Sequence, residues 1–514
     1  MDLSKTDELR RRLQWTRDAG KSRLTRSLIS AERSLYTSTQ PTGRGYCEFY
    51  MVHSVLIKVD AAGGSGDVAR FIRQAWRSLY TRIPTLSVLA ELSDEGVPVF
   101  VYQKDFEQSQ EEQWANATFK VHTAEVQSIS PECLLQEATA QVCQSACPFN
   151  DQGHAFLDAT ILESDVTKDP TSTVTVALTL RTSHLCFDGT GVWHVMHALL
   201  GAMASGAASR RSKETPEPSF LTYLNSDIIE ADHSELAQQQ IEAMNFPNGH
   251  LFGPASMEDA EMSPSMGMSK QRLSTEATAS ALLRCRQLGV TVSQLLQACF
   301  LVAMLEVYPA VETSQIYYDF PINLRDLIPL PKSFYGNAID VTFNVLPCKP
   351  LTDNVRKGRL STSEDAIAVH RLAQALTSIV IAHRGNAVVE TFSLMTAFEA
   401  LMKQATTSQE DKAPSSVRAP PIVCTADGLL DRHIATLYRG DSLDVQVLDA
   451  DVMLRRTLSL ISGRTYSFDG RLTFLLTFTP GIWPQTKVDK ILATSIRNLD
   501  FILASDIGDV VQTS

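Results

Sequence analysis

The sequence alternates short apolar runs with stretches in which apolar residues recur every three or four positions. Runs rich in Val, Ile, Thr and aromatic residues predict strands, and the longer spacing predicts helices that bury one face. In the first half we expect strands in GYCEFYMVHSVLIKVDA, VPVFVYQK, HAFLDATILES and TVTVALTLRTSHL, and helices in SGDVARFIRQAWRSLYTRIPTL and PECLLQEATAQVCQS. The order is mixed and has no regular βαβ repeat.

The second half shows the same mixture. STEATASALLRCRQLG and TVSQLLQACFLVAMLEVY predict two consecutive helices broken at Gly289, and residues 363–404 predict a long helix with a break near Gly385. Strands are expected in QIYYDFPINLRDLIP, AIDVTFNVLP, PIVCTA, SLDVQVL and RLTFLLTF, before a closing helix in PQTKVDKILATSIRNLDFILA. Each half has enough strands for its own sheet, which predicts an α+β protein.

A change of composition separates the two halves. From Ala202 to Met268 small, polar and turn-forming residues dominate, which is typical of a linker or a long surface connection. The length of 514 residues also exceeds what one hydrophobic core usually covers. We therefore expect an N-terminal domain at residues 1–205, a linker or crossover at 206–270 and a C-terminal domain at 271–514.

Composition and charge narrow the class of protein. Apolar residues make up 44% and charged residues 20%, which is ordinary for a soluble globular chain. The formal charge of −12 argues against a nucleic-acid partner. We find neither a long uncharged apolar window nor an apolar signal segment, so we expect no membrane partner and a cytoplasmic location. Nine scattered cysteines fit a reducing compartment.

The stretch RTSHLCFDGTGVW lies between a predicted strand and a predicted helix. A histidine at such a strand end can face a cleft, where neutral imidazole accepts protons, so His184 is a candidate general base. Gly189 and Gly191 permit a tight turn and a close backbone approach. Asp188 either polarises the imidazole or pairs with a cation. On the residues alone, a hydrogen-bonded histidine beside a turn aspartate explains the pattern equally well.

Other chemical motifs are weak. His194 and His197 lie three apart on the next predicted helix, a spacing that suits a metal, but no glutamate or cysteine of matching spacing joins them. Cys143 and Cys147 lack a histidine pair and are interpreted as core-facing. We find no P-loop, nucleophile elbow or dinucleotide fingerprint, so we expect neither a metal nor a bound cofactor.

Several motifs resemble one family. HLCFDG resembles the HxxxDG motif of the CoA-dependent acyltransferase superfamily, which includes the BAHD enzymes and the condensation domains of peptide synthetases. PINLRDLIPLP and FYGNAI resemble that family's NLR segment and the Gly-Asn element after it. Within the family, GVTVSQLLQACFLVAML, TADGLLDRHI and LDADVMLRRT before YSFDGRLTFLLTF are similar to fungal O-acyltransferases of the trichothecene 15-O-acetyltransferase type.

The resemblance implies a fold and a reaction. The fold would be two chloramphenicol-acetyltransferase-like α/β sandwich domains with a central tunnel, in a monomer. Acyl-CoA, with acetyl-CoA favoured, would be the co-substrate, a small-molecule hydroxyl the acceptor and His184 the base. Asp188, Gly189 and Arg325 would hold the motif in shape, although on the residues alone Arg325 reads as a solvated loop arginine. Asn337 would line the acceptor face, and a turn role fits it equally well.

Departures from the family pattern leave alternatives open. The plant BAHD motif DFGWG is absent, and DADVML at residues 449–454 stands in its place. Condensation domains usually carry a second histidine where this chain has Ser183, which disfavours that interpretation. The first alternative is a carrier-protein-dependent condensation or product-release acyltransferase, and the negative charge weakly disfavours docking on an acidic carrier. The second is a non-catalytic binding protein, which the retained His, Asp and Arg disfavour.

Overall fold

The chain divides into two compact units by its internal packing. Unit 1 comprises Met1–Asp232, Arg325–Ala338 and Asp431–Arg455, and unit 2 comprises His233–Leu324, Ile339–Leu430 and Arg456–Ser514. This division differs from a simple split along the sequence, because two short segments of the second half pack with the N-terminal unit. The structure, a computed structural model, describes residues 4–17, 22–29, 32–33, 35–36, 49–60, 64–104, 108–125, 130–144, 149, 153–163, 173–206, 215–244, 266–308, 315–347, 360–407, 422–456 and 461–505.

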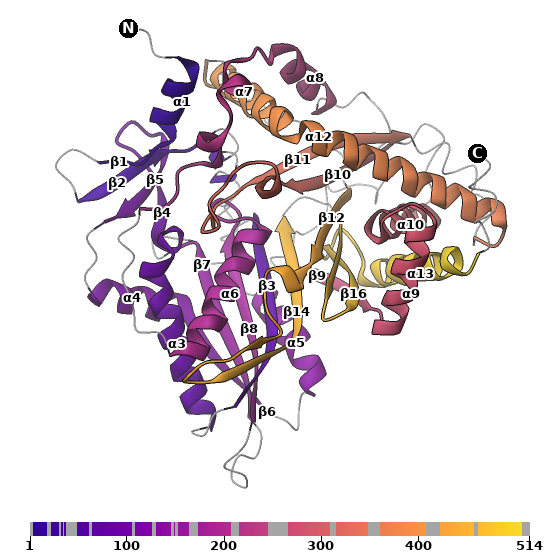
Figure 1. Cartoon of the computed structure of the whole chain (residues 1–514), viewed down its shortest axis with the longest axis horizontal. Coiled ribbons are helices and arrows are strands. Elements are labelled where there is room, and N and C mark those ends of the chain that lie inside the picture. The colour runs from indigo at the N-terminus through magenta and orange to yellow at the C-terminus, as the bar shows by residue number, and fades with distance from the viewer. Residues whose placement is uncertain are drawn as a thin grey trace. The chain divides into compact units, whose positions relative to one another are not determined.

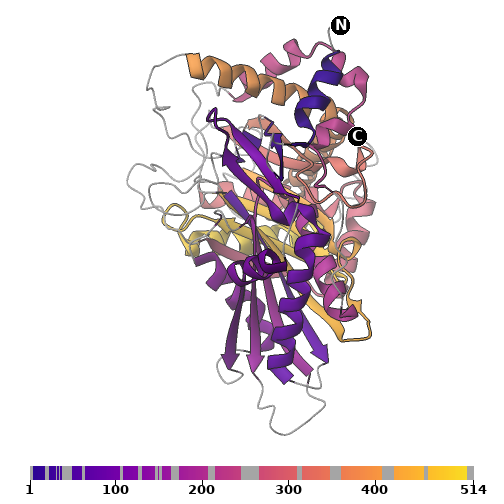
Figure 2. The same cartoon turned by 90° about the vertical axis from the view of Figure 1, so that its left-hand side faces the viewer.

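Unit 1 is built on a six-stranded sheet with the strand order β13-β14-β3-β8-β7-β6 (Figure 1). Its strands are β3 (Phe49–Asp60), β6 (Phe119–Glu125), β7 (Ala155–Glu163), β8 (Thr173–Ser183), β13 (Leu437–Tyr438) and β14 (Asp444–Arg456). The strand β8 pairs antiparallel with β3 on one side and with β7 on the other. Figure 2 shows the strands of this sheet side by side.

Helices cover both faces of this sheet. The helices are α3 (Gly64–Arg82) and α6 (Gly189–Ser205), which pack on each other, and α5 (Pro131–Gln144). Successive side chains of a strand point to opposite faces. On β3, His53 contacts α6 through Gly189, whereas Ser54 accepts a hydrogen bond from Thr139 of α5. The α3–α6 pair and α5 therefore lie on opposite faces, which explains why β8 is buried along nearly its whole length.

Smaller elements complete unit 1. A four-stranded sheet has the order β1-β2-β5-β4, with strands β1 (Thr16–Arg17), β2 (Arg23–Ser27), β4 (Val88–Leu92) and β5 (Pro98–Gln103). The remaining helices are α1 (Lys5–Leu13), α4 (Gln108–Thr118) and α7 (Ser226–Glu230), and the 3-10 turns are η1 (Pro84–Ser87) and η3 (Phe220–Tyr223). Two further 3-10 turns, η4 (Leu324–Asp326) and η5 (Leu430–Arg432), each begin with a residue of unit 2 and continue into unit 1. The expected linker at 206–270 thus contains η3 and α7, as well as α8 (Ser234–Met244) of unit 2.

Unit 2 has its own six-stranded sheet, with the order β11-β10-β12-β15-β16-β9. Its strands are β9 (Gly267–Arg272), β10 (Gln315–Asn323), β11 (Ile339–Pro347), β12 (Ile422–Leu429), β15 (Ile461–Phe468) and β16 (Arg471–Phe478), and its helices besides α8 are α9 (Thr275–Gln287), α10 (Val292–Val307), α12 (Ser363–Thr407) and α13 (Gln485–Ala504). The helix α10 packs against α12 and α13 and is buried almost throughout. Burial on all sides explains its nearly continuous apolar sequence.

The two predicted helix breaks have different outcomes. The break at Gly289 is confirmed, because that residue has a φ of +66° between α9 and α10. The break near Gly385 is wrong, because α12 continues through it from Ser363 to Thr407. A glycine inside a helix costs only about 1 kcal/mol relative to alanine. Packing along the rest of α12 offsets that cost.

The helix α12 also bears on the expectation of no membrane partner. Its stretch Ser363–Met395 is long and apolar enough to cross a membrane by length and composition, and 33% of its most apolar window is buried. The helices α9 and α10 meet the same criteria when they are taken together as one pair, bent by 94°. One or two such helices are weak evidence for a membrane span, because core helices of soluble proteins meet the same criteria. The sequence patterns alone had not indicated such a stretch.

Candidate active site

The turn between β8 and α6 places His184. The strand ends at Ser183, whose N–H donates to the carbonyl oxygen of His154 at 2.9 Å. The Ser183 hydroxyl oxygen then accepts from the N–H of Leu185 at 3.2 Å, which turns the chain immediately after the strand. His184 therefore follows a strand that is buried along nearly its whole length, and is itself only 6% exposed.

Asp188 anchors this turn through both carboxylate oxygens. It caps α6, with Oδ1 accepting from the N–H of Gly191 at 2.7 Å. Its Oδ2 accepts from Nη1 of Arg325 at 2.5 Å and from the N–H of Ala338 at 2.7 Å. The side chain is completely buried. One carboxylate thus joins the start of α6 to both ends of the segment 325–338.

Arg325 is held in place by more than its ion pair with Asp188. Its Nη2 donates to the carbonyl oxygen of Gly336 at 2.6 Å, and its guanidinium lies 5.6 Å from the ring centre of Phe334. The segment 325–338 is therefore folded around the guanidinium. Arg325 is 11% exposed, and it does not lie in the solvated loop that the residues alone indicated.

Glycine is needed at 191 rather than at 189. A Cβ on Gly191 would overlap the carbonyl oxygen of Tyr335, whereas a Cβ on Gly189 would meet only Nε2 of His53, at 3.9 Å. Neither glycine has a positive φ. The close backbone approach that we expected from this pair therefore takes place at Gly191, where α6 meets the segment 325–338.

Asn337 contacts His184 directly. Its amide nitrogen donates to the main-chain carbonyl oxygen of His184 at 2.9 Å and lies 3.4 Å from Nδ1 of the same residue. The first contact is a normal hydrogen bond, and the second is long for one. Asn337 thus restrains the backbone of His184 and lies against the Nδ1 side of the ring, so that Nε2 is the nitrogen on the other side.

His53 is a contributor that sequence patterns did not reveal. Its Nε2 lies 3.1 Å from the carbonyl oxygen of Gly189, to which it donates, and its ring meets Trp193 edge to face at 4.7 Å. Period-two alternation on β3 indicates which of its residues are buried. It does not indicate that the sheet faces the start of α6 at this position, so no signal in one sequence identifies His53.

Of the other histidines singled out from the sequence, His194 lies near the motif, with its ring centre 6.3 Å from that of Tyr335. Burial, with the charges of Arg325 and His433, lowers the pKa of His194 to about 4. Nδ1 of His197 is 2.9 Å from the hydroxyl oxygen of Tyr438. Burial raises the pKa of the Cys143 thiol to about 12, which makes it a poor nucleophile. Cys147 lies outside the described residues.

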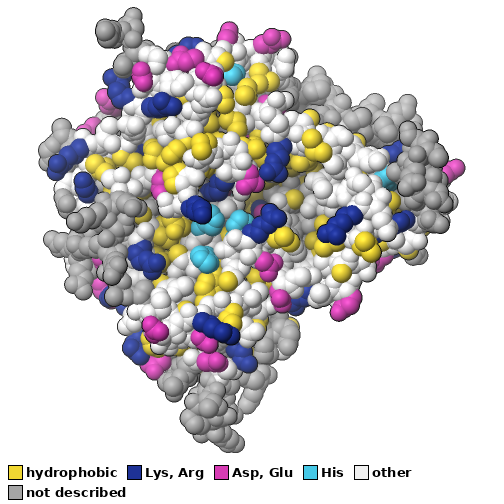
Figure 3. All heavy atoms as spheres, in the orientation of Figure 1, with side chains coloured by type: hydrophobic (Ala, Val, Ile, Leu, Met, Phe, Trp, Pro, Cys, Tyr) yellow, Lys and Arg dark blue, Asp and Glu magenta, His cyan; other side chains and the backbone are white. Residues whose placement is uncertain are grey.

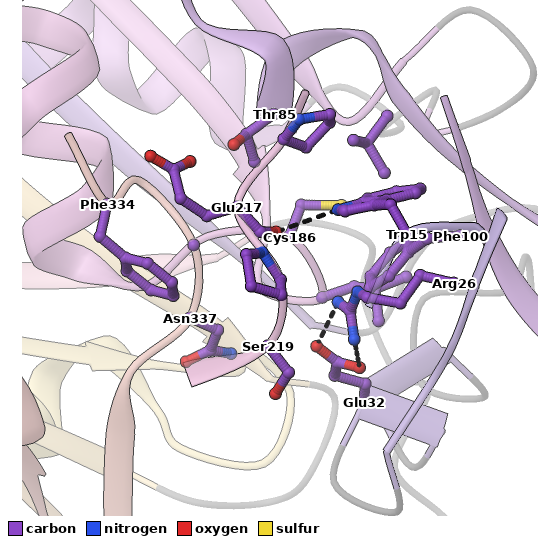
Figure 4. Close-up of a pocket in the computed structure, with 15 residues that line it drawn as sticks. Trp15, Arg26, Glu32, Thr85, Phe100, Cys186, Glu217, Ser219, Phe334 and Asn337 are labelled. Carbon is purple, nitrogen blue, oxygen red and sulfur yellow. Dashed lines mark hydrogen bonds and ion pairs between the residues drawn. The ribbon is translucent and has the colours of Figure 1, made fainter. Parts of the chain in front are cut away.

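A small pocket lies beside the motif (Figure 4). Its volume is about 40 Å³, which is room for roughly three water molecules. Its lining includes Trp15, Phe100, Phe334, Cys186, Ser219 and Asn337. Arg26 also faces the pocket, and Glu32 neutralises it through two contacts, at 3.0 and 2.8 Å. The Ser219 hydroxyl oxygen is buried without a hydrogen-bond partner among the described residues.

The predicted site residues come together in unit 1. The structure links Asp188 to Arg325, and Asn337 to His184, and it places Gly189 within reach of His53. His184 and Asp188 come from one turn, and Arg325 and Asn337 from a segment more than a hundred residues later. The arrangement is a histidine at a strand end whose backbone is fixed from both sides, as a rigidly positioned proton acceptor requires.

Comparisons with known proteins identify the fold. No family model matches the sequence, and no curated protein matches it. Among solved structures, the TRI3 trichothecene 15-O-acetyltransferase from Fusarium sporotrichioides is similar, with a TM-score of 0.74 and 13% identity, over 96% of this chain and 98% of that one. The condensation domain from the Monacolin K polyketide synthase MokA matches with a TM-score of 0.60 and 10% identity, over 94% and 98%.

A third neighbour was solved with an acyl-CoA. The starter condensation domain of rhizomide synthetase RzmA, as a mutant in complex with C8-CoA, matches with a TM-score of 0.57 and 13% identity, over 94% and 95% of the two chains. Identities this low establish the fold alone. The chain has a two-domain, condensation/CoA-acyltransferase-like fold, as the sequence motifs predicted.

Proposed function

We propose that this chain is an acyl-CoA-dependent O-acyltransferase, with acetyl-CoA as donor and a hydroxyl of a fungal-type secondary metabolite as acceptor. The observation that carries the proposal is the placement of His184 directly after β8, with its carbonyl oxygen held by Asn337 and its turn held by Asp188. The fold likeness to a trichothecene 15-O-acetyltransferase supports an acetyl donor and a hydroxyl acceptor. The neighbour in complex with C8-CoA supports a CoA-bound donor.

In the proposed reaction His184 first accepts a proton from the acceptor and then donates it to the leaving group. Its Nε2 removes the proton from the acceptor hydroxyl, and the oxygen attacks the carbonyl carbon of the thioester. The tetrahedral intermediate collapses with cleavage of the carbon–sulfur bond, and the imidazolium returns the proton to the departing CoA thiolate. The products are the ester and free CoA. Nε2 is assigned to this step because Asn337 lies against Nδ1.

The other residues of the motif position the base. Asp188 and Arg325 hold the turn and the segment 325–338 together, and Gly191 allows the close approach between them. Asn337 fixes the backbone of His184. Proximity and orientation of this kind account for a large part of the rate in two-substrate reactions, because a rigidly placed base loses little entropy in the transition state.

A second candidate uses the same histidine with a different donor. Condensation domains are among the structural neighbours, so a carrier-bound acyl group is the alternative to free acyl-CoA. Carrier proteins are acidic and dock on basic surfaces. On the face drawn in Figure 3, Lys and Arg side chains lie scattered among apolar and uncharged atoms rather than in one continuous patch. With the net charge of −12, this weakly disfavours docking on an acidic carrier protein. We further propose a cytoplasmic monomer.

Thiol release tests the proposal. The purified chain is incubated with acetyl-CoA or a longer acyl-CoA and a panel of hydroxylated metabolites, and free CoA is measured with a thiol reagent. We expect release that depends on the acceptor and is lost in His184→Ala. A matched control is His122→Ala, because this half-exposed histidine of β6 contacts Asp158 instead of the motif. It should retain the activity.

Each other outcome points to a different conclusion. Unchanged release in His184→Ala would contradict its role as the base. Turnover with an acyl group on a carrier protein, but with no free acyl-CoA, would favour the condensation candidate. No turnover with either donor would support a binding protein without catalysis.

A further inference from the structure

A second group of ionisable side chains lies in unit 2, apart from the candidate active site. It consists of Asp340, His383 and Glu390, whose ligand atoms all lie within 4.8 Å of one another. Among the described residues it is the one group of His, Cys, Asp and Glu that could hold a metal ion. No step of the proposed acyl transfer uses it.

Two packed elements bring these residues together. Asp340 is the second residue of β11, where it pairs with Ile322 of β10. His383 and Glu390 lie seven positions apart on α12, which packs against β11. Seven residues are close to two full helical turns, so both side chains project from one face of the helix. The group therefore joins a strand to the helix that covers it.

The group is buried and its imidazole is held in orientation. Asp340 is 2% exposed and His383 is 8% exposed. The ring of His383 meets Phe320 of β10 edge to face, with the ring centres 5.7 Å apart. Two carboxylates and one imidazole gathered in such a place are ligand types that bind divalent transition-metal ions.

The geometry on the Nε2 side of His383 fits a metal ion. Nε2 lies 2.9 Å from Oδ2 of Asp340, yet the described residues provide no aligned hydrogen bond to Nε2. Two ligand atoms that are each about 2.1 Å from one ion are about 3.0 Å apart at a right angle and about 3.4 Å apart at the tetrahedral angle. The observed separation of 2.9 Å is closer to the right-angle value than to the tetrahedral one, so it suits an ion whose coordination is expanded by water.

The other side of the ring has the partner that a metal-bound histidine requires. Nδ1 of His383 contacts Oε2 of Glu390. Metal-ligating histidines almost always donate their second N–H to a carboxylate, a carbonyl or water, which fixes the tautomer and orients the ring. Glu390 is placed to accept Nδ1–H while Nε2 carries its lone pair toward Asp340.

We propose that Asp340 and Nε2 of His383 bind a divalent transition-metal ion of the Zn²⁺ class, with Glu390 as the outer carboxylate and water in the remaining positions. An imidazole ligand favours first-row transition metals over Mg²⁺ and Ca²⁺, which prefer oxygen ligands. The competing occupant is a proton on His383, which would satisfy both carboxylates without a metal. The role of the ion is to fasten α12 to β11.

Metal binding by the full chain tests this proposal. The protein is stripped with a chelator, dialysed and titrated with Zn²⁺ by calorimetry, with Mg²⁺ as the comparison ion. Co²⁺ is added separately, because its visible absorption reports imidazole coordination. We expect one Zn²⁺ per chain, a higher melting temperature with Zn²⁺ and no comparable effect of Mg²⁺. His383→Gln and Asp340→Asn should each weaken binding at least tenfold, and Glu390→Gln about 10- to 100-fold.

A control variant on the same helix, α12, accompanies this experiment. Glu364→Gln removes an exposed carboxylate near the start of α12 and should bind Zn²⁺ like the parent. If His383→Gln does not fold, Asp340→Asn and the Co²⁺ spectrum of the parent decide the question. Absence of stoichiometric Zn²⁺ binding by the parent would overturn the proposal and leave the proton as the occupant. Zn²⁺ binding that is unchanged in His383→Gln and in Asp340→Asn would also overturn the proposal.

Discussion

Replacement of Asp188 by alanine tests the energetics of the motif most directly. The side chain is completely buried, and its carboxylate accepts three hydrogen bonds, from Gly191, Arg325 and Ala338. The substitution removes the cap of α6 and the partner of Arg325 in one step. We expect a loss of stability as well as a loss of any catalysis that depends on the position of His184.

The expected magnitude follows from the three contacts. Loss of a helix cap costs about 1 kcal/mol. A buried ion pair broken on one side costs about 3–5 kcal/mol, and here Arg325 remains 11% exposed with the carbonyl oxygen of Gly336 as a second partner. The unpaired N–H of Ala338 costs about 1–3 kcal/mol. These losses share one side chain and are not additive, so we expect about 4–6 kcal/mol in total.

Urea unfolding measures this loss. The fluorescence of the buried tryptophans, among them Trp193 of α6, reports unfolding, and circular dichroism provides an independent signal. The matched control is Asp67→Ala, which removes an exposed carboxylate paired with Arg70 on α3. An exposed pair of this kind contributes at most about 1 kcal/mol. If Asp188→Ala unfolded within about 1 kcal/mol of the parent, our account of the motif would be refuted.

A double-mutant cycle tests the ion pair separately. Arg325→Ala leaves the carboxylate of Asp188 with two N–H donors and no cation, whereas the double variant leaves neither charge. We therefore expect the double variant to be more stable than the sum of the single losses predicts, by about 1–3 kcal/mol. Simple additivity would show that the two side chains do not stabilise each other.

Three further predictions follow from the same structure. Gly191→Ala should unfold at a clearly lower urea concentration than Gly189→Ala, because only the first substitution adds a Cβ that overlaps a carbonyl oxygen. Equal unfolding midpoints of the two variants would contradict this. Burial lowers the pKa of His154 to about 4, whereas the value in the unfolded chain is near 6.5. The contribution of neutral His154 to the free energy of unfolding is therefore complete above pH 6.5 and falls by up to about 3 kcal/mol as the pH drops toward 4. Urea midpoints measured from about pH 8 to about pH 4.5 should depend less on pH in His154→Gln than in the parent. Asn337→Ala should lower kcat of the proposed reaction about 10- to 100-fold with little change in KM, since it orients His184; steady-state kinetics showing a change in KM alone would contradict a positioning role.

The local pattern of apolar residues indicated most of the helices and strands, because apolar residues recur with a different period in the two. The strand before His184, the helix after it and the break at Gly289 all follow from residues close together in sequence. The break expected at Gly385 was wrong, since glycine only weakens a helix and cannot end one that packing supports. Propensity is a local quantity, and α12 is stabilised by contacts along its length.

Contacts between distant segments could not be predicted in the same way. Gly191 and Gly189 look alike in sequence, and only the approach of Tyr335 separates them. His53 is one buried residue among several on β3 until α6 is placed against it. The pairing of β14 with the sheet of unit 1 is likewise invisible locally, because its sequence reads as an ordinary strand of the second half.

The position of β14 has a consequence for how this protein is made. On a ribosome, the first 232 residues emerge with β3 as an open sheet edge, and β14 follows only when synthesis has reached about residue 455. At about 5–20 residues per second that interval lasts about 10 to 45 s. An open edge is a template for pairing with another chain. The nascent N-terminal part should therefore need chaperone protection, and a fragment truncated near residue 232 should aggregate when expressed alone.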